Sequence, residues 1–392
     1  MLHEPHSRHS QNVEYDFSTE LESPSAASQW PAAGDATAFG DVLSASWQPP
    51  LLPQKPAATW SQPRRRASRY RLLKLHASGG IGEVYLALDE ELRREVALKV
   101  MRPHRALEPE ARHRFLQEAE ITSRLEHPGI VPVYGLVEDG DYGPCYAMRF
   151  IVGETLHESI YRFHLGHRRH DACERRFGLH ALLGRFVAVC NTIAYAHAHG
   201  ILHRDVKPAN ILLGRYGETL VVDWGSAKSL QENTPTIQNL ETRPDFVLPL
   251  ADPYATLPGK LLGTPAFMSS EQAAGKWEDV GVASDIFSLG ATLYAILTGH
   301  APFEGGPMRD ILERARRCAF PAPHQRKHDV PAALEAICLK AMALAPEERY
   351  GSALELAEDV EHFLAGEPVS VYREPLLARV GRMLRRIGRW WR

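Results

Sequence analysis

The sequence has few cysteines and no long hydrophobic run. Its five cysteines are widely spaced and odd in number, which argues against a disulfide framework and indicates a reducing compartment. The most hydrophobic stretch, 286–297, is shorter than the roughly 20 residues that a membrane span needs and contains Ser288 and Thr292, so it predicts a buried core helix. The N-terminus lacks the charged-then-apolar pattern of a secretory signal. We therefore expect a chain that neither carries such a signal nor crosses a membrane.

An excess of one charge is also lacking, because 45 Lys and Arg nearly balance 48 Asp and Glu. This balance gives no indication of a nucleic-acid partner. No internal repeat of fixed period is present, which argues against solenoids and propellers. No Gly-x-x-x-x-Gly-Lys-Ser/Thr run occurs, which excludes a P-loop ATPase. What remains is the composition of a soluble globular protein, with 44% hydrophobic and 24% charged residues and enough length to bury a sizeable core.

Residues 1–66 are rich in proline, serine and alanine and show no sustained periodicity, so we expect a disordered N-terminal tail. Trp30, Trp47 and Trp60 are either short docking anchors or ordinary aromatics in a tail, and the second interpretation is favoured. Ser68 follows three arginines and is either a phosphorylation site with a basic recognition sequence or part of a solvated boundary. The boundary interpretation is again favoured.

From Tyr70 onward, short apolar and β-branched runs alternate with glycines and predict antiparallel strands. The predicted strands cover 71–75, 83–87, 95–100, 131–137 and 145–151, with one helix at 110–125 before Pro128 and Gly129. Beyond Gly153 the long apolar-periodic segments predict helices at 179–199, 284–298, 330–343 and 352–364. The sequence therefore predicts a small β-rich lobe followed by a helix-dominated lobe.

A glycine-rich turn lies between the first two predicted strands. It comprises Ala77, Ser78, Gly79, Gly80, Ile81, Gly82 and, after Glu83, Val84. Glycines let backbone amides approach anionic phosphates without interference from side chains. Glycine pairs also make ordinary hairpins, so this motif alone is weak. Two further residues distinguish a nucleotide-binding turn from an ordinary hairpin. Lys99 on the third predicted strand is suited to pair with α- and β-phosphates, and Glu118 on the next helix can pair with that lysine.

The strongest motif is the run from Ile201 to Asn210, followed by Asp223, Trp224 and Gly225. Asp205 can accept a hydroxyl proton, and Lys207 can reach a transferring phosphate. Asn210 and Asp223 can hold magnesium. These are the parts that phosphoryl transfer requires, in the order and spacing of a catalytic loop.

From about 70 to 369 the chain resembles a eukaryotic-type (Hanks-type) bacterial serine/threonine protein kinase, closest in style to those of planctomycetes. Further motifs that carry the resemblance are at 115–120, 127–134, 263–272, 284–290 and 346–350. The resemblance implies an α+β, two-lobed protein kinase fold. The implied catalytic domain covers 70–365, with an N-lobe at about 70–152 and a C-lobe at about 153–365.

The resemblance also implies roles for individual residues. Asp205 is the expected base, Lys207 stabilises charge on the γ-phosphate, and its place two residues after Asp205 favours Ser/Thr over Tyr substrates. Asn210 and Asp223 are the expected metal ligands, and Lys99 with Glu118 forms the expected ion pair.

The same comparison implies an adenine pocket. Met148 is expected behind the pocket, Phe150 and Ile151 in the hinge beside the base, and Ala97 and Leu212 on the two faces of the ring. The full set expected to bind ATP is this pocket, Lys99 and the glycine-rich turn.

Other positions have implied structural or regulatory roles. Glu271 is expected to pair with Arg349, and Asp285 to brace the catalytic loop. Thr264 is expected to contact Asp205 and Lys207. Arg204 is expected to bind a phosphorylated activation segment, because a guanidinium matches phosphate geometry.

Three residues depart from the family pattern: Ala77 replaces the first glycine, Trp224 replaces the usual Phe, and Ser270 replaces the Pro before Glu271. None of these changes removes a catalytic group. The long stretch 223–271 suggests an order–disorder switch set by phosphorylation. Candidate sites within it are Ser229, Thr234, Thr236, Thr242, Tyr254 and Thr256, of which Thr256 is our choice.

Residues 162–178 are rich in Arg and His, which predicts an insert between helices of the second lobe. His164, His167, His170 and Cys173 are spaced by three and could meet a metal on one helix face. A solvated insertion is favoured, because ligands three apart progressively rotate off a common face.

Residues 366–392 form a predicted basic C-terminal tail, and 376–392 has the pattern of a basic amphipathic helix. Such helices favour anionic membrane surfaces. Peripheral membrane contact and packing on the kinase core remain alternatives.

Together these features predict a kinase of bacterial signal transduction that uses ATP with Mg²⁺, or alternatively Mn²⁺. Its expected partners are proteins with Ser/Thr acceptors, including a second copy of itself through phosphorylation in trans, and not nucleic acid. We expect a cytoplasmic location, with the inner membrane face as the alternative. The main competing hypothesis is a pseudokinase that binds nucleotide and acts as a scaffold.

Overall fold

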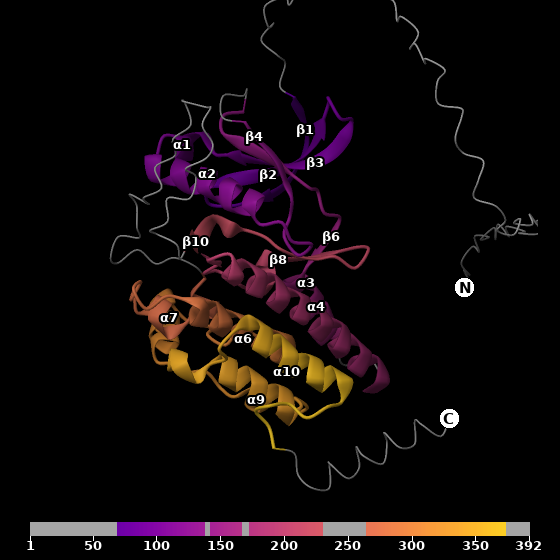
Figure 1. Ribbon diagram of the computed structural model, residues 1–392, viewed down its shortest axis with the longest axis vertical. Coiled ribbons are helices and arrows are strands. Elements are labelled where there is room, and N and C mark those ends of the chain that lie inside the picture. Colours follow the sequence, from indigo (N-terminus) through magenta and orange to yellow (C-terminus); the bar gives the residue numbers. More distant parts are fainter. Residues whose placement is uncertain (1–68, 138–141, 167–171, 230–263, 374–392) are drawn as a thin grey trace, which may run out of the picture. The chain divides into compact units, whose positions relative to one another are not determined.

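The computed structural model describes residues 69–137, 142–166, 172–229 and 264–373. Its first part is an antiparallel sheet with strand order β1-β2-β3-β5-β4 (Figure 1). The strands are β1 (Tyr70–Ser78), β2 (Gly82–Asp89), β3 (Arg94–Met101), β4 (Val133–Val137) and β5 (Cys145–Met148). The short helix α1 (Pro103–Ala106) and the longer α2 (Pro109–Arg124) follow β3. These elements form the N-lobe.

Alternation along β3 gives the sheet two apolar faces. Val96 and Leu98 belong to a buried cluster on one face, and Met101 belongs to a second cluster together with Phe115 of α2. Successive strand residues point to opposite faces, so Lys99 lies on the same face as Met101, toward α2. The strand pattern therefore directs the lysine at the helix that carries Glu118.

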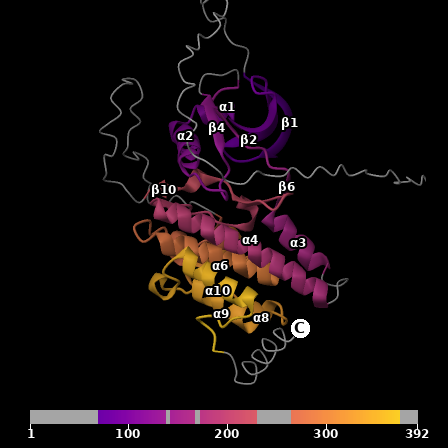
Figure 2. The same cartoon turned by 45° about the vertical axis from the view of Figure 1, so that its right-hand side comes forward.

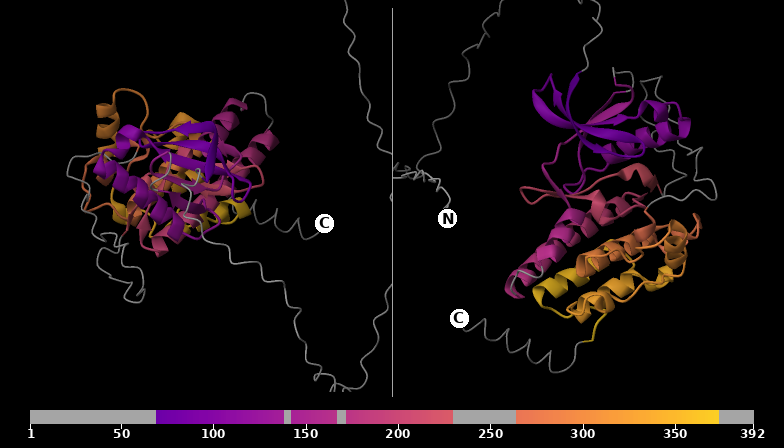
Figure 3. Two further views of the ribbon diagram at one scale, coloured as in Figure 1. Left: turned by 90° about the horizontal axis from the view of Figure 1, so that it is seen from above. Right: turned by 180° about the vertical axis from the view of Figure 1, so that it is seen from behind.

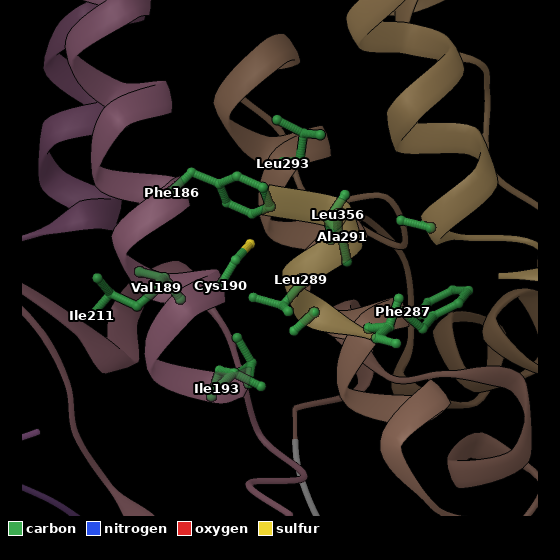
Figure 4. Close-up of a cluster of buried hydrophobic side chains, with 14 of the residues drawn as sticks. Phe186, Val189, Cys190, Ile193, Ile211, Phe287, Leu289, Ala291, Leu293 and Leu356 are labelled. Atoms are coloured by element: carbon green, nitrogen blue, oxygen red, sulfur yellow. The ribbon is translucent and has the colours of Figure 1, made fainter. Parts of the chain in front are cut away.

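The C-lobe is mostly helical. Its helices are α3 (Leu156–Gly166), α4 (Ala172–Ala198), α5 (Ser270–Ala273), α6 (Val282–Thr298), α7 (Met308–Arg316), α8 (Pro323–Arg326), α9 (Ala332–Ala341) and α10 (Ala353–Ala365). Helices α4, α6, α9 and α10 pack together, and α3 lies beside α4 (Figure 2). Figure 4 shows side chains of α4, α6 and α10, among them Phe186, Leu293 and Leu356, meeting in the core.

Two small sheets connect the helices to the N-lobe. One contains β6 (Gly153–Thr155), β8 (Ile211–Gly214) and β9 (Thr219–Val221), and the other pairs β7 (Ile201–Leu202) with β10 (Lys228–Ser229). Figure 3 shows these strands between the N-lobe sheet and the large helices. Because β7 and β8 flank residues 203–210, they fix both ends of the catalytic loop.

Several sequence-based expectations are corrected by the structure. The strand expected at 145–151 ends at Met148, and residues 149–152 form a connection. The proposed insert at 162–178 was wrong in part, because 162–166 belong to α3 and 172–178 to α4.

Strands β6 to β10 were missed, since two to four residues are too few to show a period. The tails at 1–66 and 376–392 lie outside the described residues, whereas Val369 of the segment 366–373 is buried against the core.

The stretch 286–297 lies in α6 and is buried, as expected for a core helix. Within the described ranges one helix, Arg176–Ala198, is long and apolar enough to cross a membrane by length and composition alone. This segment of α4 contributes Phe186, Val189 and Cys190 to the C-lobe core. Its hydrophobicity therefore has a structural explanation in helix packing.

Two helical glycines allow a matched test of this packing. A Cβ on Gly290 of α6 would lie 2.8 Å from Ala341 Cβ and 2.7 Å from Met342 Cγ, whereas a Cβ on Gly184 of α4 meets nothing within 4 Å. We expect Gly290→Ala to lower the free energy of unfolding by about 1–3 kcal/mol through overpacking. Gly184→Ala should raise it by about 0.5–1 kcal/mol through helix propensity. Urea denaturation measures both, and shifts of the same sign would contradict the assigned close approach of α6 and α9.

Candidate active site

The catalytic loop is held by a buried carboxylate of α6. Asp285 accepts hydrogen bonds from the backbone amides of His203 (2.8 Å) and Arg204 (2.7 Å), and His197 Nε2 lies 2.8 Å from the same carboxylate. Arg204 has a left-handed backbone, with φ of 66°. Burial alone would raise the pKa of Asp285, but its hydrogen bond with His197 and the nearby histidines hold it below its ordinary value. The negative charge therefore stays in place under the loop.

Asp205 receives three hydrogen bonds through its carboxylate. Thr264 N donates to Oδ1 (2.9 Å), and Lys207 Nζ (2.6 Å) and Asn210 Nδ2 (3.2 Å) donate to Oδ2. Lys207 Nζ also donates to Thr264 Oγ1 at 2.5 Å. A carboxylate has about four acceptor positions. One position therefore remains on Asp205 for a further donor, such as a hydroxyl group.

The Asp223-Trp224-Gly225 turn faces α2. Asp223 has a left-handed backbone with φ of 66°, and its side chain is 52% exposed. Trp224 is buried, donates from Nε1 to Val221 O (3.3 Å) and lies against His203, with 4.6 Å between ring centroids. A Cβ on Gly225 would lie 3.0 Å from Glu118 Oε2. Glycine at this position therefore leaves room for the carboxylate of α2.

Lys99 and Glu118 form an ion pair, with 2.5 Å between Nζ and Oε1, and Lys99 Nζ lies 4.0 Å from Asp223 Oδ1. Burial alone would lower the pKa of Lys99, but the charges of Glu118 and Asp223 outweigh it and raise the pKa. Tyr146 of β5 donates its hydroxyl to Glu118 Oε1 at 2.8 Å. Burial and the nearby Glu118 raise the pKa of Tyr146 well above its ordinary value, so the hydroxyl keeps its proton.

The glycine-rich turn is only partly a loop. Ala77 and Ser78 end β1, and Gly82 and Val84 belong to β2, so Gly79, Gly80 and Ile81 form the tip. A Cβ on Gly80 meets nothing within 4 Å, whereas one on Gly82 would lie 2.6 Å from Val100 O. Gly80 therefore leaves an open approach to the backbone, and Gly82 is required by packing on β3.

The expected adenine-pocket residues come from strands β3, β5 and β8 and from the connection 149–152 that follows β5. Ala97 of β3 is opposite Met148 of β5 in the strand register, and Leu212 lies on β8. The Phe150 ring contacts His76 of β1 edge-on, with 5.2 Å between centroids. The backbone amide and carbonyl of Ile151 have no hydrogen-bond partner among the described residues. They are therefore available to the edge of a bound base.

A buried ion pair holds the segment that begins at Thr264. Arg349 donates to both carboxylate oxygens of Glu271, at 2.7 and 2.9 Å, and Ser284 Oγ donates to Glu271 Oε1 at 2.7 Å. Ser270, at the position of the family proline, has its hydroxyl oxygen 3.1 Å from Glu271 Oε2 and 3.3 Å from Leu344 O, and its single hydrogen can be donated to either acceptor. The serine therefore contributes a hydrogen bond to the same network.

Sequence reasoning missed four residues that support this site: Tyr146, His197, His203 and Gln272. Gln272 donates from Nε2 to Arg204 O at 2.9 Å, and His203 Nε2 lies 3.2 Å from Val222 O. His203 and Gln272 were part of the recognised motifs at 201–210 and 263–272 but had no assigned role. Tyr146 and His197 stand in apolar segments, where nothing in the spacing distinguishes a positioning residue from a core residue.

The alternative metal site gains no support within the part of the chain that the structure describes. There, no group of three or more His, Cys, Asp or Glu side chains could hold a metal ion. His164 Nε2 lies 3.0 Å from Ile296 O, and Cys173 is exposed. His167, His170 and the chosen phosphorylation site Thr256 lie outside the described residues.

Comparison with known proteins identifies the family. The model of the protein kinase domain matches residues 70–361. The chain belongs to the protein kinase family. Two similar proteins are named serine/threonine-protein kinase PknD: one from Protochlamydia amoebophila (strain UWE25) and one from Chlamydia pneumoniae, each 36% identical over 300 residues. The predicted two-lobed fold and Hanks-type bacterial family are confirmed.

The crystal structure of the Mycobacterium tuberculosis PknI kinase domain is also similar, with a TM-score of 0.53 and 25% identity. The match covers 76% of this chain and 96% of that domain. The PknD matches cover 76% of this chain but only 30% and 31% of the relatives. The similarity therefore concerns the kinase domain rather than the whole of those longer proteins.

The Glu271–Arg349 pair predicts a pH-dependent stability. The pKa of Glu271 falls from 4.5 to about 2, because the Arg349 ion pair and hydrogen bonds outweigh burial, which acts in the opposite direction. The lowered pKa stabilises the fold fully above pH 4.5, and this contribution is lost as the pH falls toward 2.

We expect Glu271→Gln to be less stable than wild type by an amount that is constant above about pH 5. The difference should shrink by up to about 1.4 kcal/mol per pH unit below pH 4.5. Urea denaturation between pH 7 and pH 3.5 measures it. As a control, Glu313→Gln in the exposed pair with Arg317 should change stability by less than about 1 kcal/mol at every pH. A difference for Glu271→Gln that does not vary with pH would contradict the assigned pKa.

Proposed function

We propose that this chain is a Ser/Thr protein kinase that transfers the γ-phosphate of ATP to hydroxyl groups of proteins, including a second copy of itself. The observation that carries the proposal is the arrangement around Asp205, whose carboxylate contacts Lys207, Thr264 and Asn210. The formed Lys99–Glu118 pair supports it, because kinases need that pair in place for activity. Proteins of this family act on Ser/Thr acceptors.

Asp205 acts on the substrate hydroxyl. Its remaining acceptor position receives the hydroxyl hydrogen and orients the oxygen toward the γ-phosphorus. As the new oxygen–phosphorus bond forms, the bond between the γ-phosphorus and the β–γ bridging oxygen breaks, and the hydroxyl proton passes to Asp205. The products are a phosphoprotein and ADP.

The two lysines serve different phosphates. Lys207 is held beside the attacking oxygen by Asp205 and Thr264 and neutralises charge on the transferring group. Lys99, fixed by Glu118, binds the α- and β-phosphates. Both lysines act by positioning and electrostatics, which dominate phosphoryl transfer.

Asn210 and Asp223 fit a magnesium ion by their donor chemistry. Asn210 donates through Nδ2 to Asp205, which leaves its amide oxygen for a ligand, and the Asp223 carboxylate is half exposed. Mg²⁺ prefers oxygen ligands and binds to one or two carboxylates with phosphates and water completing its shell. Kinases of this family generally use ATP with Mg²⁺ or Mn²⁺, and the bound ion neutralises phosphate charge.

The regulatory part of the proposal concerns Arg204. Its guanidinium donates to Ser226 O at 2.5 Å and to Ala227 O at 3.3 Å, directly after the Asp223-Trp224-Gly225 turn. A phosphate on the activation segment could therefore compete for this arginine and reposition the turn. The choice of Thr256 as the modified residue stays a prediction.

Intact-mass analysis of the purified chain with ATP and Mg²⁺ tests the proposal. We expect wild type to gain phosphate, at a rate per molecule that rises with protein concentration if the reaction is in trans. Asp205→Asn should slow the gain by about 10²–10⁴ because it removes the base. Asp310→Asn, an exposed carboxylate on α7, is the matched control and should react as wild type. No gain in wild type on itself or on a generic Ser/Thr substrate would favour the pseudokinase hypothesis.

The C-terminal tail carries a separate prediction. Kinase domains of this family are normally cytoplasmic, and we propose that 376–392 brings this one to an anionic membrane surface. Wild type should co-sediment with phosphatidylserine vesicles, and truncation at 375 should abolish this. Replacing the tail arginines by glutamine should weaken binding less than truncation does. Equal sedimentation of wild type and the truncated chain would contradict the proposal and favour packing on the core.

A further inference from the structure

Arg102, directly after β3, contacts the glycine-rich turn in two ways. Its backbone amide donates to Ile81 O at 3.1 Å, which extends the β2–β3 ladder one residue beyond the Gly82–Met101 pair. Its guanidinium reaches across to the end of β1, where NH2 donates to Ser78 Oγ at 2.5 Å. The same nitrogen lies 3.6 Å from Glu83 Oε1 of β2. One residue therefore ties together the ends of three strands at the turn.

The turn has few other restraints at its tip. Gly79 N donates to Gly82 O at 2.9 Å, but Ser78, Gly79 and Gly80 are exposed and a Cβ on Gly80 meets nothing. A glycine-rich tip of this kind samples many backbone conformations in solution. The side-chain contacts of Arg102 therefore provide a specific restraint on an otherwise open segment.

The base of the turn also packs toward the Lys99–Glu118 pair. A Cβ on Gly82 would lie 3.5 Å from Phe115 of α2, so the turn sits against that ring. Phe115 contacts Tyr146, with 5.2 Å between centroids, and Tyr146 donates to Glu118. Packed groups therefore connect the base of the turn to the carboxylate that fixes Lys99.

We propose that Arg102 is a positioning residue that holds the glycine-rich turn in the conformation that binds the phosphates of ATP. This inference rests on the proposed kinase function. Holding the turn before ATP arrives removes part of the ordering cost of binding. One terminal nitrogen of the guanidinium makes both contacts, with Ser78 and with Glu83. A lysine would keep the charge, but its nitrogen lies one bond closer to the backbone and reaches Ser78 less well.

Steady-state kinetics of the full chain with Mg²⁺ and a generic Ser/Thr substrate test the clamp. We expect Arg102→Ala to raise KM for ATP about 3- to 10-fold, the size of one ordinary hydrogen bond, and to leave KM for the protein substrate unchanged. Ser78→Ala should raise KM for ATP in the same direction. The double variant should match Arg102→Ala alone, because both changes remove the same bond.

Two further variants separate the clamp from simpler explanations. Arg105→Ala is the matched control, since Arg105 lies on α1 directly after Arg102 but pairs with the exposed Glu108, and it should keep the wild-type KM for ATP. Arg102→Lys should restore KM only in part. Full restoration by lysine would show that charge alone acts, and an unchanged KM in Arg102→Ala or additive effects in the double variant would also overturn the clamp.

Amide hydrogen exchange without nucleotide keeps the inference testable independently of activity. Residues 79–82 should exchange at least about threefold faster in Arg102→Ala than in wild type, while the amides of α10 stay unchanged. Faster exchange in Arg102→Ala than in wild type, in a protein that binds no ATP, would support the restraint on the turn while refuting the proposed function. Equal exchange in both proteins would refute the clamp even if the chain is an active kinase.

Discussion

The catalytic loop depends on the buried carboxylate of Asp285. Because this side chain comes from α6, the hydrogen bonds to the amides of His203 and Arg204 tie the loop to a helix that is buried along nearly its whole length. They also support the left-handed conformation of Arg204, which a non-glycine residue adopts only under constraint. Asp205 follows directly, so its orientation derives from a helix core rather than from the loop itself. A buried charge of this kind is tolerated only when fully hydrogen-bonded.

The N-lobe half of the site depends on a second buried carboxylate, Glu118. It pairs with Lys99, accepts from Tyr146 and lies against Gly225 of the turn that carries Asp223. Strand β3, strand β5, helix α2 and the turn that carries Asp223 therefore meet at one side chain. A rotation of α2 would therefore break these contacts together.

Much of the fold could be predicted from the sequence, because its signals are local. The strand alternation at 95–100, the helix at 110–125 and the buried α6 all follow from apolar periodicity. The family was recognised from the ordered set of motifs that runs from the glycine-rich turn to Asp223. The short strands β6 to β10 could not be predicted, because their identity comes from pairing partners distant in sequence. The contacts of Tyr146 and Arg102 could not be predicted for the same reason, because their partners Glu118 and Ser78 are 28 and 24 residues away in the sequence.

The glycines of the glycine-rich turn illustrate how a motif can combine two requirements. Gly80 faces open space and suits a close ligand, whereas Gly82 lies over Val100 O and beside Phe115, where any side chain would displace β3 or α2. The sequence pattern alone assigns both to phosphate binding. The structure assigns them different roles. Gly80 leaves open space at the tip, and Gly82 allows the turn to pack against β3 and against the helix that carries Glu118. Ala77 in place of the first glycine is compatible with this division, since it lies within β1, opposite Val84, in extended backbone that any residue can adopt.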